Sequence, residues 1–172
     1  MTKDQLCPAE ISETELKQVP FDLLMFDERN DMLIVYDRHT KEHLSLNPVD
    51  FTERYQSFLQ RVLNIPNIPV RTLAINGGVI FYINKGLGGF SKEELLYLPW
   101  HQLFAKGARI VVTNAISKAK ERQSAVFVAP VETRSGYEIP YNTFMLCAQE
   151  TLMAFMAVTD ENEVPPTESA ND

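Results

Sequence analysis

The sequence contains few cysteines and few glycines, and the shortage of cysteine excludes a small protein that is stabilised by several disulfide bonds. Its 172 residues include two cysteines and seven glycines. Cys7 and Cys147 cannot build a disulfide-stabilised scaffold, and they do not form a pair with the spacing of metal ligands. Cys147 lies in an apolar run, where we interpret it as a small core residue. The sequence therefore predicts a fold that depends on a hydrophobic core and on no structural metal.

Positive charge is also scarce. The chain has 16 Lys and Arg residues against 23 Asp and Glu residues, a net charge of −7 and a pI of about 5.0. Nucleic acids and anionic membranes attract basic surfaces, so this balance argues against both as partners. The one basic region, residues 106–122, lacks the charge density and the interleaved aromatic side chains that nucleic-acid binding requires. Contact with an acidic protein partner requires less positive charge than nucleic-acid binding, and it is an alternative use of this region.

Long apolar runs are absent as well. No segment reaches the roughly 18–20 apolar residues that a membrane-spanning helix requires. The amino-terminal stretch lacks the apolar segment of a secretory signal. These features predict a cytoplasmic protein in a reducing environment, without contact with a membrane.

The remaining composition is typical of one globular domain. Hydrophobic residues make up 45% of the chain and aromatic residues 10%, which is enough to form a core at this length. We expect a polar leader at residues 1–18 and a single α+β domain at residues 19–159. Residues 160–172 are acidic and lack large apolar side chains, so we expect a disordered tail there.

Local patterns in the first half of the domain predict strands followed by a helix and a hairpin. Short apolar runs between residues 19 and 46 are typical of a strand meander. Asn47-Pro48 is a helix-start signal, because Asn caps a helix and Pro tolerates its first position. An apolar face continues to Leu63, so we predict a helix there. Asn76-Gly77, between β-branched runs, predicts a hairpin over residues 70–85.

The second half predicts two more strands and three helices. Ser91 and Glu94 have the spacing of a capping box, which indicates a short helix. Residues 108–113 predict a buried strand, residues 114–123 a surface helix and residues 125–131 another strand. Residues 141–158 are rich in Met, Ala and Leu, so we expect a long apolar C-terminal helix. The predicted fold class is α+β, with an antiparallel or mixed sheet packed against three to four helices.

Five of the seven glycines lie between Gly77 and Gly89. The first two fit the predicted hairpin turn. The others lie between a strand and a capped helix, where backbone amides and the positive helix end can bind an anion. Their order does not match the phosphate-loop or dinucleotide patterns. Two interpretations stay open, a plain connector and an anion-binding loop with these residues: Lys85, Gly86, Gly88, Gly89, Ser91 and Lys92.

No catalytic motif appears in the sequence. His39 and His43 are four residues apart, but the turn expected there does not bring them together on a metal. Trp100-His101 is interpreted as an aromatic anchor with an amphipathic neighbour, and a general base beside a pocket is the alternative. A Ser-His-Asp order, a nucleophile elbow and an HExxH motif are all absent. We therefore predict no catalytic residue, no cofactor and no metal site.

The predicted C-terminal helix suggests an interface. Its apolar side chains surround most of its circumference, so the protein's own core or another chain must cover them. Pairing across a two-fold axis would cover both copies, and we predict a homodimer on that basis. The expected interface residues are Phe144, Leu152, Phe155 and Met156.

The combined features predict a function without catalysis. We interpret the protein as a regulatory protein-interaction module, such as an adaptor, a chaperone-like protein or an inhibitor, that binds another protein. The alternative is a small enzyme or binding protein for a phosphorylated ligand, which would use the loop from Gly86 to Lys92.

Overall fold

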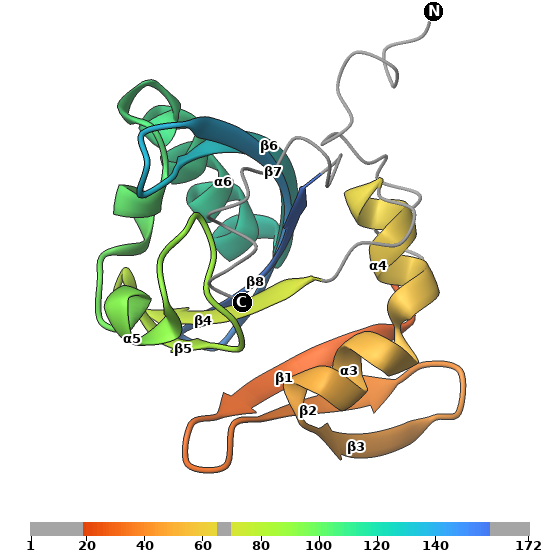
Figure 1. Ribbon diagram of the computed structural model, residues 1–172. Helices are drawn as coiled ribbons and strands as arrows, with labels where there is room; N and C mark the ends of the chain where they lie inside the picture. Colours follow the sequence, from red (N-terminus) through yellow and green to blue (C-terminus); the bar gives the residue numbers. More distant parts are fainter. Residues whose placement is uncertain (1–18, 65–69, 159–172) are drawn as a thin grey trace, which may run out of the picture.

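The protein folds into two antiparallel sheets with helices between and around them (Figure 1). The computed structural model describes residues 19–64 and 70–158. The predicted leader and acidic tail lie outside these residues. The elements in chain order are β1 (Phe21–Asp27), β2 (Met32–Asp37), β3 (Glu42–Leu46), α3 (Pro48–Arg54), α4 (Gln56–Leu63), β4 (Arg71–Asn76), β5 (Val79–Ile83), α5 (Lys92–Leu95), η1 (Trp100–Leu103), η2 (Lys106–Ala108), α6 (Arg109–Arg122), β6 (Ser124–Glu132), β7 (Glu138–Ala148) and β8 (Thr151–Val158).

The first sheet and the two helices after it form what we call the N-terminal module, residues 19–64. Its strands have the order β1-β2-β3, which confirms the predicted meander. Asn47 caps α3, because its side chain accepts a hydrogen bond from the Asp50 amide at 2.8 Å. The predicted helix is interrupted at Tyr55, whose φ and ψ of −107° and 25° are not helical. Two short helices therefore replace the single one.

The second sheet has the strand order β5-β4-β8-β7-β6 and lies between two layers. The N-terminal module covers one face, while α5, η1 and α6 cover the other (Figure 1). All eight residues of β8 are buried. No helix in the described part of the chain is long and apolar enough to cross a membrane.

The predicted long helix over residues 141–158 is wrong. This segment forms β7 and β8, joined by a tight turn in which Gln149 has a φ of 58°. A strand buried on both faces has a continuous apolar sequence without alternation. Periodicity cannot distinguish such a run from a buried helix, which explains the error.

The predicted strand over residues 108–113 is also wrong, because Ala108 ends η2 and residues 109–113 begin α6. Val112, Ala115 and Ala119 are buried at helical spacing. Ile110 is 70% exposed, which a central strand would not allow. The surface helix predicted after this segment is the remainder of α6, and the strand predicted at residues 125–131 lies within β6.

Two turn and capping predictions are confirmed. The β4–β5 hairpin turns at Gly77 and Gly78, which have φ angles of 63° and 79°. The capping box at α5 is complete, since Ser91 accepts from the Glu94 amide and Glu94 accepts from the Ser91 amide. The helix that it starts has only four residues.

Candidate functional site

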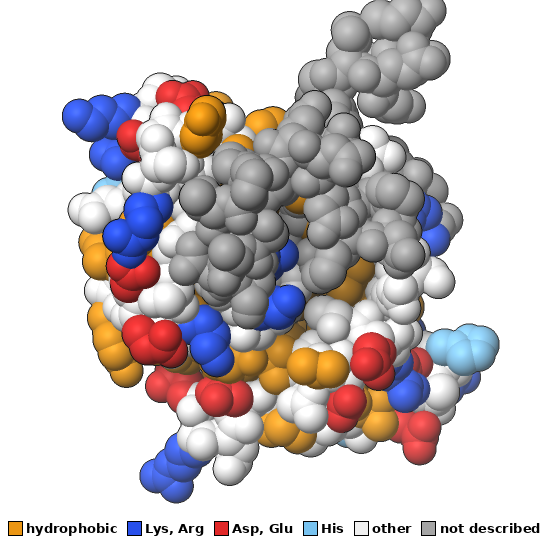
Figure 2. Space-filling view, in the orientation of Figure 1, with side chains coloured by type: hydrophobic (Ala, Val, Ile, Leu, Met, Phe, Trp, Pro, Cys, Tyr) orange, Lys and Arg blue, Asp and Glu red, His pale blue; other side chains and the backbone are white. Residues whose placement is uncertain are grey.

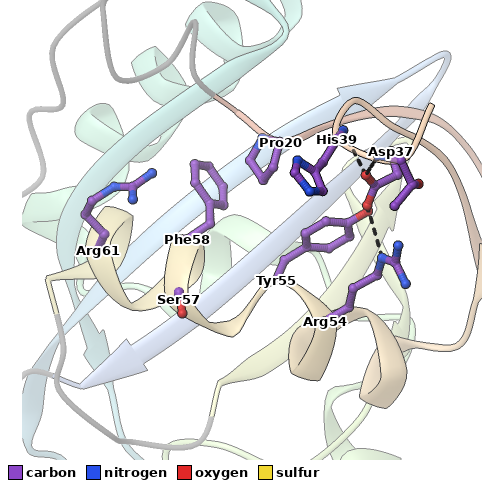
Figure 3. Close-up of a pocket in the computed structure, with 9 residues that line it drawn as sticks. Pro20, Asp37, His39, Arg54, Tyr55, Ser57, Phe58 and Arg61 are labelled. Atoms are coloured by element: carbon purple, nitrogen blue, oxygen red, sulfur yellow. Dashed lines mark hydrogen bonds and ion pairs between the residues drawn. The ribbon is translucent and has the colours of Figure 1, made fainter. Parts of the chain in front are cut away.

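A pocket of about 400 Å³ opens in the N-terminal module, between the β2–β3 turn and the helices α3 and α4 (Figure 3). Among the described residues, it contains the carboxyl group and the phenol whose pKa values depart furthest from normal. Such groups in a pocket mark a candidate site. The lining residues are Pro20, Asp37, His39, Thr40, Arg54, Tyr55, Ser57, Phe58 and Arg61.

Asp37 ends β2 and is only 4% exposed. Its Oδ1 accepts hydrogen bonds from the backbone amides of His39 and Thr40, both at 2.9 Å, as is typical of an aspartate that starts a turn. Its Oδ2 accepts from the Tyr55 hydroxyl at 2.7 Å and from Arg54 Nε at 3.0 Å. The amide of Thr40 and these other donors hold the pKa of Asp37 well below its usual range. Asp37 is therefore a fixed negative charge with both oxygens occupied.

Tyr55 links this carboxylate to the aromatic core of the module. Its ring lies 4.6 Å from that of Phe21 and 5.1 Å from that of Phe51, measured between centroids. Burial, together with the hydrogen bond to Asp37, raises the pKa of Tyr55 to about 12. The phenol thus stays protonated and serves as a hydrogen-bond donor.

Two arginines line the wall of the pocket on aromatic rings. The Arg54 guanidinium lies 5.9 Å from the centroid of the Tyr55 ring and that of Arg61 lies 5.6 Å from the Phe58 centroid. Arg54 uses Nε for Asp37, and its side chain is 36% exposed. Arg61 is exposed and has no ion pair among residues 19–64 and 70–158. Guanidinium groups held in this way can donate paired hydrogen bonds to a carboxylate or a phosphate.

The pocket differs in charge from the chain as a whole, which is acidic. Figure 2 shows acidic and basic side chains interspersed on the described part of one face of the molecule. Among the described residues that line the pocket, Asp37 is the only carboxylate and already has Arg54 as its partner, while Arg61 adds a second positive charge. The lining is therefore suited to an anionic group.

The glycine-rich loop lies elsewhere in the fold, between β5 and α5. A Cβ atom on Gly86 would lie 2.2 Å from the Phe90 carbonyl oxygen. Gly88 and Gly89 have φ angles of 66° and 84°, which favour glycine. The Gly88 carbonyl accepts from the Arg134 amide at 2.7 Å. Close packing and turn geometry account for these glycines, while Lys85 and Lys92 are exposed beside them.

The side chains predicted to form a dimer interface lie inside the protein. Phe144 and Phe155 pack toward the N-terminal module, whereas Leu152 and Met156 pack toward the face covered by α6. Each is at most 5% exposed. Because the predicted helix is a pair of strands, alternate side chains point to opposite faces, and both faces are covered.

The histidines considered as ligands are not brought together. His39 lies in the β2–β3 turn, and His43 lies on β3 with its ring 5.1 Å from that of Tyr36. Within the described ranges, no group of three or more His, Cys, Asp and Glu residues could hold a metal ion. Trp100 is buried, with its ring 5.2 Å from Phe104, as expected for an aromatic anchor.

The sequence interpretation did not identify the pocket residues. One signal was available for two of them, since Phe58 and Arg61 are three residues apart, the spacing of one helical face. The partner of Arg54 is Asp37, 17 residues earlier. That contact depends on tertiary packing, which no local pattern encodes.

No protein-family model matches the sequence, and no curated protein matches it. Several solved structures with a partly similar backbone are described as PAS domains. One is from a Colwellia psychrerythraea protein, at 15% identity and a TM-score of 0.48 over 63% of this chain and 97% of that chain. Another is from an HTR-like protein of Haloarcula marismortui, at 17% identity and a TM-score of 0.46 over 62% and 98%.

A third is the PAS domain of the Cronobacter turicensis RpfR quorum-sensing receptor in complex with BDSF. It is 14% identical, with a TM-score of 0.45 over 55% of this chain and 96% of that chain. These three matches cover between 55% and 63% of this chain, at 14–17% identity. Scores of this size carry no statement about a ligand or a partner.

Proposed function

We propose that the protein is a non-catalytic, regulatory protein-interaction module, and that the pocket beside Asp37 holds an acidic group of its partner. The observation that carries the proposal is the pairing of Asp37 with internal donors, while the guanidinium groups of Arg54 and Arg61 stay at the pocket wall.

Binding suits these groups better than acid–base catalysis does. A general acid or base is most effective when its pKa lies near the working pH. The pKa of Asp37 is far below that range, and the pKa of Tyr55 is raised to about 12. Both groups keep one protonation state, so they supply fixed charge and fixed donors.

A carboxylate on a larger molecule fits the chemistry of the pocket. Arginine N–H groups lie beside the rings of Tyr55 and Phe58, so the polar donors are next to an apolar wall. Thr40 and Ser57 line the same space. A hydrogen bond to a charged group contributes about 1.5–3 kcal/mol. Losing the Arg61 contact should therefore weaken binding by roughly tenfold or more.

A labelled oligoglutamate peptide tests the proposal by fluorescence anisotropy with the full chain. We expect it to bind, and an oligoglutamine peptide of the same length not to bind. Arg61→Gln should weaken the binding, whereas Arg29→Gln, an exposed arginine of the β1–β2 turn, should not. Arg61 is the better target because Arg54 also supports Asp37.

Two outcomes would overturn the proposal. Equal losses from Arg61→Gln and Arg29→Gln would mean that the peptide responds to overall charge and not to the pocket. Binding of inorganic phosphate as tight as that of the peptide, with full displacement of the peptide, would identify a site for small anions instead of a protein partner.

A further inference from the structure

The two outer strands of the five-stranded sheet are protected to different degrees. At β5, residues 97–100 cover the edge, since the Ile80 amide donates to the Leu98 carbonyl at 3.0 Å and the Tyr97 amide donates to the Ile80 carbonyl at 2.6 Å. At the opposite edge, β6 pairs with β7 on its inner side. The outer side of β6 is therefore the less protected edge, where another strand could pair.

The hydrogen-bond pattern shows which residues of β6 face outward. The Cys147 amide donates to the Gln123 carbonyl, and the Thr133 amide donates to the Tyr137 carbonyl. Bonded residues alternate along an antiparallel pair, so the odd-numbered residues between 123 and 133 bond to β7. The even-numbered residues direct their N–H and C=O groups away from the sheet.

Most of this outer edge has no backbone partner. The Pro130 carbonyl accepts from the Ala105 amide at 3.0 Å, and proline has no N–H group to satisfy. No backbone hydrogen bond from residues 19–64 or 70–158 reaches the outward groups of Ser124, Val126 and Val128. An edge of this kind is a template for another strand.

The side chains of the edge do not discourage pairing. Residues 124–131, SAVFVAPV, carry no charge. Ser124, Val126 and Val128 are half-buried, so a neighbouring strand would cover more of their surface. Natural edges are usually protected by charged side chains, and the one protective residue here, Pro130, lies where residues 104–105 already cover the strand.

We propose that β6 pairs antiparallel with β6 of a second copy of this chain, with Val126 of one copy opposite Val126 of the other. This register places Ser124 opposite Val128 and satisfies the outward N–H and C=O groups of all three residues. It joins two five-stranded sheets across a two-fold axis, the commonest symmetry of protein assemblies. The interface differs from the one that the sequence predicted.

Charge at the two ends of β6 favours a second copy over an unrelated peptide. Lys120, Glu121 and Arg122 are exposed just before the strand and together carry one net positive charge, and Glu132 is exposed at its end. Antiparallel pairing brings the beginning of one β6 to the end of the other. Opposite charges then meet at both ends of the interface, and neither Arg122 nor Glu132 has an ion pair within residues 19–64 and 70–158.

Sedimentation equilibrium of the full chain tests the proposal, and we expect a reversible monomer–dimer equilibrium. Val126→Pro removes an outward N–H group at the two-fold axis without removing a bond to β7, so it should give a monomer. Val126→Ala keeps that N–H group and should still dimerise. If the proline variant fails to fold, Val126→Lys places two like charges opposite each other and should also give a monomer.

A charge exchange tests the antiparallel register. Arg122→Glu and Glu132→Arg should each weaken the dimer by roughly tenfold, and the double variant should recover it. The proposal is overturned by a wild-type protein that is monomeric at every concentration, by a Val126→Pro or Val126→Lys variant that dimerises like the wild type, or by a double variant without recovery. Arg61→Gln should leave the dimer unchanged, so this test is independent of the pocket.

Discussion

The N-terminal module and helix α6 contact the five-stranded sheet through different kinds of side chain. Toward the N-terminal module the contacts are aromatic, and the Phe155 ring stacks 5.3 Å from Phe51 and 6.2 Å from Phe144. Helix α6 contributes the small side chains Ala115 and Ala119, while Trp100 and Phe104 form an aromatic contact elsewhere on that face. Large rings fill the space under the module, and alanines let α6 approach the sheet closely.

The two sides of the sheet should therefore respond in opposite ways to a change in side-chain size. An aromatic layer should be damaged most by truncation, which leaves a cavity. A layer of small residues should be damaged by enlargement, because the helix has no room to move inward. The polar groups that support each layer, Asp37 on one side and the capping box of α5 on the other, should have smaller effects.

The largest effect is expected from Phe155→Ala. Phe155 is fully buried between the module and the sheet, so truncation should lower the free energy of unfolding by about 3–5 kcal/mol. Phe155→Leu fills more of the space and should cost less. Chemical denaturation measures both variants. A loss below that of an ordinary surface substitution would show that the aromatic layer does not hold the module on the sheet.

Asp37→Asn should have the next largest effect, about 2–3 kcal/mol, because it leaves Arg54 and Tyr55 with a weaker acceptor. The loss should depend on pH. The folded pKa of Asp37 is lowered, so its charge stabilises the protein fully above the unfolded pKa of about 3.9, and this contribution disappears as the pH falls toward the folded value.

Denaturation at several pH values checks the prediction. The wild-type protein should lose its advantage over Asp37→Asn below about pH 4. Glu53→Gln, an exposed carboxyl of the same module, serves as the control and should show little difference at any pH. If the wild-type protein stays more stable than Asp37→Asn by the same amount in acid, the shape of the Asp37 side chain, and not its charge, stabilises the fold.

Local signals in the sequence predicted the parts of this fold that depend on neighbouring residues. Asn47, the Asn76-Gly77 turn and the Ser91–Glu94 box each act within about four residues, and the structure contains all three. The meander and the α+β class follow from short apolar runs between turn residues. These features need no knowledge of what packs on them.

Tertiary burial decides the features that the sequence did not reveal. Residues 141–158 are apolar throughout because both faces of β7 and β8 are covered, and this removes the alternation that marks a strand. Residues 110–112 are β-branched, yet they are helical because α6 packs through Val112 and its alanines. The pocket requires Asp37 and Arg54 to meet across 17 residues.

Ala119→Leu tests the face covered by α6. Ala119 is fully buried, so the larger side chain should push the helix from the sheet and lower the free energy of unfolding by about 1–3 kcal/mol. Ser117→Leu, at an exposed position of the same helix, should have little effect. Calorimetry of the two variants compares them. An Ala119→Leu protein as stable as the wild type would mean that the small-residue layer has spare room.

The smallest effect is expected from Ser91→Ala, on the same side of the sheet. The variant loses the acceptor for the Glu94 amide and should lower the free energy of unfolding by about 1 kcal/mol. Ser91→Asp keeps an acceptor at the cap and should restore most of the stability. Because α5 is only four residues long, the cap is a large part of what holds it helical. If Ser91→Ala and Ser91→Asp are equally stable, the packing of Leu95 in the core holds this segment, and the helical layer depends on its buried side chains alone.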